Sequence, residues 1–124
     1  MNTVFIADDE LIIRQGIKCI IDWEQLGFEI IGEASNGEDA LNFILNKHPD
    51  LVLMDIRMPK MLGLDVVEAA RNKGFNGKVI ILSGYTDFKY AQAAIKNGVD
   101  YYLTKPIDED ELYETVDSDR KSVV

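Results

Sequence analysis

The sequence is poor in cysteine, in basic residues and in long apolar runs, and each scarcity excludes something. A single cysteine, Cys19, excludes an internal disulfide and suits a reducing compartment. The 13 basic residues against 22 acidic ones give a net charge of −9, which argues against direct binding to nucleic acid or to an anionic membrane. No apolar run approaches the length of a membrane span, and the opening MNTVFIADDE lacks the basic start of a signal peptide. We therefore expect a cytoplasmic domain that binds basic partners or a divalent cation.

Apolar residues are abundant enough, at 47% of the 124 residues, to form one real core. Short apolar runs predict strands at residues 3–7, 28–34, 51–54, 78–83 and 100–104. Helical spacing of apolar residues predicts helices at residues 11–21, from 38, at 64–72, around 88–95 and from 112. The last helix is expected to be short, because polar residues follow it.

The alternation of strands and helices predicts the fold class. The first, third and fourth strands are continuous apolar runs, which is typical of strands buried on both faces of a parallel sheet. Five strand–helix units with short links predict a doubly wound α/β fold, with helices on both faces of a five-stranded parallel sheet. Right-handed crossovers then bring the carboxyl ends of all strands to one edge, where such sheets bind their ligands.

Polar side chains follow several of these strands. Asp8 and Asp9 follow the first strand, Asp55 ends the third, Ser83 ends the fourth and Lys105 follows the fifth. Three carboxylates that lie close together repel one another, and a hard divalent cation such as Mg²⁺ relieves that repulsion. A lysine can contact an oxyanion and a serine can donate a hydrogen bond to it. These are the parts needed for phosphoryl transfer to an aspartate.

Each of these residues alone has a plainer interpretation. Asp8 and Asp9 suit the start of a helix as caps, and Asp55 and Ser83 suit turns. Lys105 alone would be read as a solvated surface lysine. The expected convergence of all five on one edge favours the metal and phosphoryl chemistry.

Four motifs carry a resemblance to a known family. They are ADDE (7–10), LMDIRMPKMLG (53–63), LSGY (82–85) and YLTKP (102–106). On these motifs the sequence resembles the receiver domain of a bacterial two-component response regulator, over nearly the whole chain. The resemblance implies the flavodoxin-like strand order 2-1-3-4-5. It also implies a receiver domain over residues 1–117, with 118–124 as the polar end of the last helix or the start of a linker to an output domain.

The resemblance implies a metal-dependent acceptor site. Asp55 is the expected phosphoryl acceptor. Asp8 and Asp9 are expected to hold Mg²⁺ together with Asp55 and the backbone carbonyl of Arg57, and Mn²⁺ is expected to substitute for it.

The resemblance also implies a switch. Ser83 and Lys105 are expected to engage the bound phosphoryl group. Tyr102 is expected to turn inward as Ser83 moves, although an aromatic residue in a strand is also typical of simple packing. The peptide bond between Lys105 and Pro106 is expected to be cis, which the residues alone would not predict.

The implied function is that of a signalling switch rather than a turnover enzyme. A sensor histidine kinase is the expected phosphoryl donor. The face formed by the helix around 88–95, the strand 100–104 and the last helix is expected to change and to support dimerisation. The stretches 22–41 and 82–106 resemble receivers joined to AraC-type helix-turn-helix domains. DNA would then be contacted only through that output domain, and no membrane partner is expected.

Three alternatives stay open. A Mg²⁺-dependent phosphohydrolase with an aspartyl nucleophile needs a second aspartate two residues after Asp55, where Arg57 stands instead. A flavodoxin-like carrier needs a first loop rich in Gly, Ser and Thr, whereas the carboxylates of residues 8–10 would repel a phosphate. A receiver-like interaction module that is never phosphorylated is the third, although every expected functional position is filled.

Overall fold

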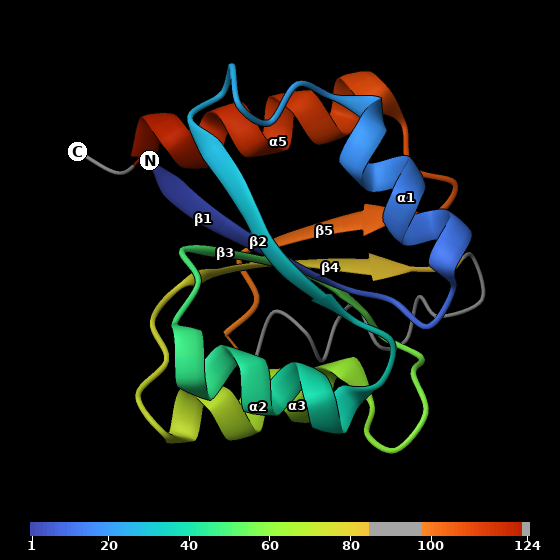
Figure 1. Cartoon of the computed structure of the whole chain (residues 1–124), viewed down its shortest axis with the longest axis vertical. Coiled ribbons are helices and arrows are strands. Elements are labelled where there is room, and N and C mark those ends of the chain that lie inside the picture. The colour runs from blue at the N-terminus through green and yellow to red at the C-terminus, as the bar shows by residue number, and fades with distance from the viewer. Residues whose placement is uncertain (85–97, 123–124) are drawn as a thin grey trace.

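Five parallel strands and four helices form the part of the chain that the structure, a computed structural model, describes: residues 1–84 and 98–122 (Figure 1). The strands are β1 (Asn2–Ala7), β2 (Phe28–Ala34), β3 (Leu51–Asp55), β4 (Lys78–Ser83) and β5 (Tyr101–Thr104). The helices are α1 (Leu11–Ile20), α2 (Gly37–Lys47), α3 (Gly63–Asn72) and α5 (Glu109–Ser122). The strand order is β2-β1-β3-β4-β5, which confirms the predicted topology. The helix expected around 88–95 lies outside the described residues.

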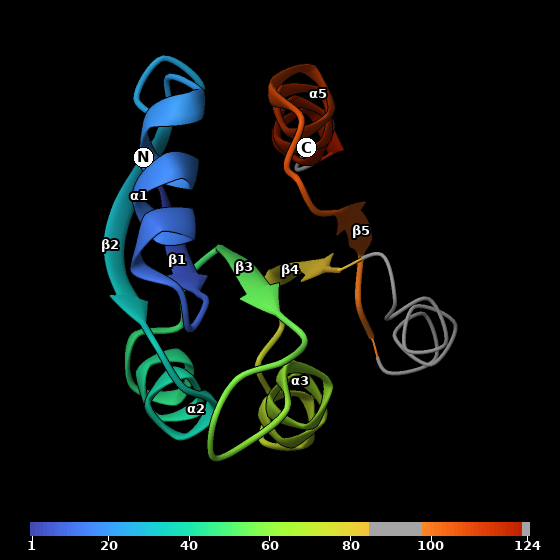
Figure 2. The same ribbon diagram turned by 90° about the vertical axis from the view of Figure 1, so that its right-hand side faces the viewer.

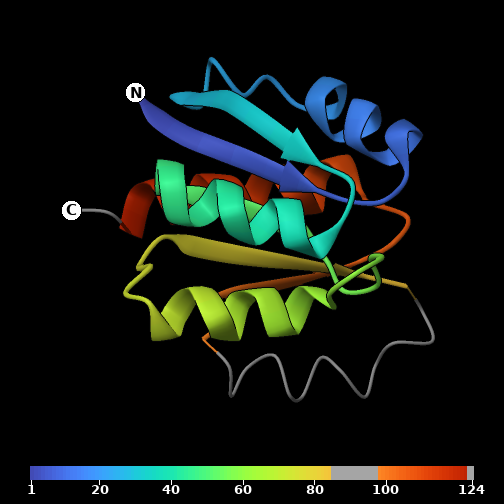
Figure 3. The ribbon, with the colours of Figure 1, turned by 60° about the horizontal axis from the view of Figure 1, so that its bottom comes forward.

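Helices cover both faces of the sheet. Helices α1 and α5 lie on one face and α2 and α3 on the other (Figure 2), with α2 and α3 side by side (Figure 3). Alternate residues of strand β1 face the two layers of helices. Val4 and Ile6 join the core beneath α1 and α5, and Phe5 and Ala7 join the core beneath α2 and α3. A strand that is buried on both sides needs apolar residues at every position, and this accounts for the continuous apolar runs. None of the described helices combines the length and the hydrophobicity that crossing a bilayer would need.

The helix ends show which local signals the sequence supplied. Asn36 caps α2, because its side chain accepts a hydrogen bond of 2.8 Å from the backbone N–H of Asp39.

Helix α5 has 14 residues and extends to Ser122, so the expectation of a short last helix was wrong. Leu112 and Val116 are fully buried and anchor it on the sheet. An anchored helix extends readily through polar residues, because propagation costs far less than nucleation.

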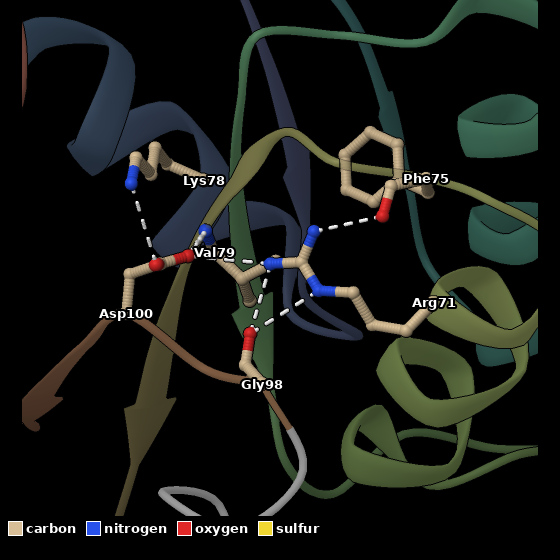
Figure 4. Close-up of polar contacts among 6 residues, drawn as sticks. All are labelled: Arg71, Phe75, Lys78, Val79, Gly98 and Asp100. Atoms are coloured by element: carbon tan, nitrogen blue, oxygen red, sulfur yellow. Dashed lines mark hydrogen bonds and ion pairs between the residues drawn. The ribbon is translucent and has the colours of Figure 1, made fainter. Parts of the chain in front are cut away.

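The chain is also tied together where it enters β5 (Figure 4). Arg71, at the end of α3, donates hydrogen bonds to the carbonyls of Gly98 at 2.8 Å and Phe75 at 3.0 Å, and pairs with Asp100 at 3.2 Å. Asp100 in turn accepts a hydrogen bond of 2.9 Å from the N–H of Val79 in β4. This network fixes the start of β5 against α3 and β4, and so positions the site residues at the other end of that strand.

Candidate functional site

The register of the strands brings the polar residues together at the carboxyl edge of the sheet. The neighbouring pairs nearest this edge are Ala7 with Met54, Asp55 with Leu82, and Ser83 with Thr104. Asp8, Asp55, Ser83 and Lys105 therefore follow one another from strand to strand along the edge. This is the convergence that the sequence predicted.

Lys105 joins two buried carboxylates. Its ammonium nitrogen Nζ lies 2.8 Å from Oδ2 of Asp8 and 3.3 Å from Oδ2 of Asp55. Asp8 is fully buried and Asp55 is only 5% exposed. Among the described residues, Lys105 is the one cation paired with these two carboxylates, which water barely reaches.

The two carboxylate oxygens of Asp8 are held in different ways. Its Oδ1 accepts a hydrogen bond of 2.9 Å from the N–H of Glu10, which closes a tight turn. Its buried Oδ2 is ion-paired with Lys105 but accepts no hydrogen bond of good geometry from any described residue. A buried carboxylate oxygen with incomplete partners is a position that a cation can satisfy.

Oxygen ligands for a hard cation gather around the Asp8 carboxylate. Carboxylate oxygens of Asp8, Asp9 and Glu10 all lie within 4.8 Å of one another, and Asp9 and Glu10 are exposed. An all-oxygen set with room for several waters is what Mg²⁺ prefers. Glu10 was not among the metal ligands predicted from the sequence. Arg57 is an exposed residue in the loop after β3, and the role of its carbonyl stays a prediction.

Burial sets the ionisation of the cluster. Loss of solvation, reinforced by the charges of Asp8 and Asp9 and opposed by Lys105, raises the pKa of Asp55 from 3.8 to about 7. Burial by itself lowers the pKa of Lys105, but the Asp8 and Asp55 carboxylates outweigh it and raise that pKa above 10.5. Lys105 is therefore a fixed positive charge at neutral pH, whereas Asp55 changes its charge close to neutral pH.

Ser83 and Tyr102 contact each other at the same edge of the sheet. Ser83 is fully buried, and its hydroxyl is hydrogen-bonded to the phenolic hydroxyl of Tyr102, which packs against the core beneath α2 and α3. The backbone N–H of Lys105 donates to the carbonyl of Ser83 at 2.8 Å, which extends the pairing of β4 and β5. The Lys105–Pro106 bond is cis.

The loop after Asp55 needs glycine at its far end. The N–H of Gly63 donates to the carbonyl of Ile56 at 2.8 Å, and a β-carbon on Gly63 would lie 2.1 Å from the carbonyl oxygen of Asp55. A side chain there would push the loop away from the acceptor carboxylate. Gly63 stands in one of the four motifs of the sequence, but no role was predicted for it.

The comparisons with known proteins agree with this geometry. The family model for the response regulator receiver domain matches residues 4–117, and the chain belongs to this family. It is 39% identical over 117 residues to the transcriptional regulatory protein YesN of Bacillus subtilis, which covers 94% of this chain and 32% of YesN. It is 45% identical over 112 residues to the transcriptional regulatory protein HptR of Staphylococcus aureus, which covers 90% of this chain and 44% of HptR. The chain thus spans less than half the length of these relatives.

Solved structures show the same fold. The receiver domain of AraT, a response regulator from Geobacillus stearothermophilus, superposes with a TM-score of 0.92 at 43% identity, and the match covers 98% of this chain and 94% of that one. A two-component transcriptional regulator AraC from Clostridium phytofermentans superposes with a TM-score of 0.88 at 34% identity, over 99% and 95% of the two chains. Both likenesses extend over nearly the whole domain.

Proposed function

We propose that this receiver domain is a phosphorylation switch in which Asp55 accepts a phosphoryl group from a phosphohistidine of a sensor histidine kinase. The observation that carries the proposal is the cluster of Asp8, Lys105 and Asp55 at the carboxyl edge of the sheet. It combines a nearly buried nucleophile with a cation 3.3 Å away and with further carboxylates for a metal ion. Membership of the receiver family supports the same role.

In the proposed reaction, one carboxylate oxygen of Asp55 attacks the phosphorus atom. The bond from phosphorus to the imidazole nitrogen breaks, and its electron pair stays on that nitrogen. Lys105 lies where it can contact an oxygen of the transferred group. Asp8 and Asp9, with Asp55 and the Arg57 carbonyl, would hold Mg²⁺ or Mn²⁺, and the bound ion would neutralise charge on the phosphoryl oxygens.

We propose that the switch acts through Ser83 and Tyr102. The hydroxyl of Ser83 is already bonded to that of Tyr102. A phosphoryl group on Asp55 that engages Ser83 would therefore change the contact that holds Tyr102. The group can shift the equilibrium only by binding the two arrangements differently, and this shared hydroxyl supplies such a difference. The responding face would include β5 and α5.

Replacing Ser83 with alanine should leave phosphorylation intact but weaken the conformational response. The variant loses the hydroxyl that links the phosphoryl group to Tyr102, while Asp55 and Lys105 are unchanged. We expect the shift in amide resonances of β5 and α5 on phosphorylation to fall to less than half. The control is Thr104→Ala, which removes an exposed hydroxyl at the end of β5. A full-size response in Ser83→Ala would refute the coupling.

An apolar surface beside Lys105 suits the approach of the donor. Ile12 on α1 is 74% exposed, and a hollow of about 400 Å³ between α1 and the residues after β5 is lined by Ile13, Gly16, Pro106 and other, mostly apolar, residues. An exposed apolar patch of this kind is typical of a protein interface. Because it adjoins Lys105, a kinase helix seated there would present its phosphohistidine toward Asp55.

The output of the switch lies outside this domain. Because the regulators YesN and HptR are two to three times longer than the matched region, we propose that the intact protein carries a DNA-binding output domain of AraC type after α5. Residues 118–124 would lead toward it. Phosphorylation would then favour a homodimer through the face that includes β5 and α5, and DNA would be bound by the output domain alone.

The proposal is tested by intact-mass spectrometry after incubation with acetyl phosphate. We expect one phosphoryl group per chain with Mg²⁺ and none after its removal with a chelator. Hydroxylamine should release the group, because an aspartyl phosphate is an acyl phosphate. No addition under any condition would make the domain a module that works unphosphorylated, and rapid turnover of many phosphate esters would make it a phosphohydrolase.

A further inference from the structure

Arg14 on α1 contacts the backbone of residues 8–10, which we call the acidic loop. Its Nη1 donates a hydrogen bond of 2.6 Å to the backbone carbonyl of Asp8, and the Arg14 side chain is only 12% exposed. That carbonyl belongs to the peptide unit that joins Asp8 to Asp9. Asp9 is exposed, so the path of the backbone is what places its carboxylate. A bond that fixes this peptide unit therefore fixes the direction in which Asp9 leaves the loop.

Among the described residues, the other hydrogen bonds of the loop lie on either side of this peptide unit. The N–H of Asp8 donates to the carbonyl of Ala34 at 3.1 Å, which holds the loop to β2 before the peptide unit. The N–H of Glu10 donates to the Asp8 side chain at 2.9 Å, which holds the loop after it. The hydrogen bond from Arg14 lies between these two hydrogen bonds, at the peptide unit that joins Asp8 to Asp9.

Glu33 on β2 anchors the guanidinium and offsets part of its charge. Its Oε1 lies 2.8 Å from Nε of Arg14, and its Oε2 lies 2.5 Å from Nζ of Lys18. The Nε and Nη1 groups of Arg14 thus bind two different acceptors, which a lysine cannot do with one nitrogen. An uncompensated cation close to the acidic loop would oppose metal binding. The carboxylate of Glu33 offsets part of that charge, because it is shared between Arg14 and Lys18.

We propose that Arg14, held by Glu33, is a positioning residue that presets the Asp8–Asp9 peptide unit for divalent-cation binding. The inference rests on the proposed function, because it assigns the cation to these carboxylates. Partners that orient metal ligands commonly change the affinity for the metal by tenfold or more when they are removed. A purely electrostatic view predicts the opposite sign, since removing a cation near the site should tighten the binding of Mg²⁺.

The test is a calorimetric titration of the unphosphorylated protein with Mg²⁺. We expect Arg14→Ala to weaken binding roughly tenfold. Lys18→Ala is the matched control, because Lys18 binds the same Glu33 but, among the described residues, makes no hydrogen bond or ion pair with the acidic loop. We expect a change of less than about twofold. Arg14→Lys keeps the charge and most of the packing, so it tests the positioning role of Arg14 even if the alanine variant is poorly folded. It should weaken binding by an intermediate factor, because it cannot bond both acceptors.

The outcomes separate the two proposals. Equal affinity in Arg14→Ala and Lys18→Ala, or tighter binding in Arg14→Ala, would overturn the positioning role while leaving the metal site standing. No binding of Mg²⁺ by the wild-type protein would overturn the metal site and this inference together. A role limited to overall stability would lower the unfolding temperature and leave the affinity of the folded molecules unchanged, which also counts against positioning.

Discussion

The Asp55→Asn variant should accept no phosphoryl group and should nevertheless be more stable than the wild-type protein above pH 7. An amide is not a nucleophile toward phosphorus, so the mass increase with acetyl phosphate should disappear. The gain in stability has a separate cause. In the folded protein the pKa of Asp55 is raised from 3.8 to about 7, because the carboxylate is buried beside Asp8. The ionised form therefore destabilises the fold, and the neutral amide does not.

The sign of the pH dependence follows from the two pKa values. Between pH 3.8 and about 7 the folded state keeps a proton on Asp55 that the unfolded state has lost, so the wild-type free energy of unfolding falls as the pH rises. The advantage of Asp55→Asn should be small near pH 4, should grow up to about pH 7, and should then level off. Its full size is on the order of 4 kcal/mol, since the pKa of Asp55 rises from 3.8 to about 7 and one pKa unit corresponds to about 1.4 kcal/mol.

Urea unfolding without metal at about pH 5 and about pH 8 measures this difference. Added Mg²⁺ should reduce it, because the wild-type cluster offers the ion one more carboxylate and should bind it more tightly. Asp65→Asn is the control, since Asp65 is an exposed acid in the first turn of α3 and should keep phosphorylation without a pH-dependent gain. A difference between Asp55→Asn and wild type that stays constant over this pH range would contradict the raised pKa of Asp55.

The Lys105→Met variant should be strongly destabilised in the absence of metal at about pH 8. It keeps a similar volume but leaves the Asp8 and Asp55 carboxylates buried without their cation. Removing one partner of a buried ion pair costs about 3–5 kcal/mol. The loss should shrink in acid, because the pKa of Asp55 rises further and a proton then neutralises it. Mg²⁺ should restore much of the stability and should bind more tightly than to wild type, because it replaces the missing charge.

The matched control removes a lysine from an exposed ion pair. Lys78 lies 3.7 Å from Asp100 and is 43% exposed in its side chain, so Lys78→Met should change the free energy of unfolding by less than about 1 kcal/mol. Thermal unfolding of both variants with and without Mg²⁺ makes the comparison. If Lys105→Met were as stable as Lys78→Met without metal, the ion pairs of Lys105 would not hold the site together.

The sequence by itself determined the fold and the edge on which the site lies. Continuous apolar runs predicted buried parallel strands, and the structure places β1, β3 and β4 at the centre of the sheet. Asp8, Asp55, Ser83 and Lys105 could be assigned to one edge because every strand of a parallel sheet ends there. The periodicity of apolar residues and the direction of the crossovers are local properties, and both can be read without coordinates. The length of α5 could not, because burial of Leu112 and Val116 outweighs the polar residues that follow.

Only the tertiary structure decided which of these residues touch and how they ionise. The sequence gives no sign that Lys105 pairs with both Asp8 and Asp55, that Asp8 is buried while Asp9 is exposed, or that Arg14 reaches the acidic loop. Such contacts depend on register, side-chain rotamers and packing between segments far apart in the chain. A pKa depends on burial and on charges a few ångströms away. Those distances exist only once the sheet has brought its strand ends together.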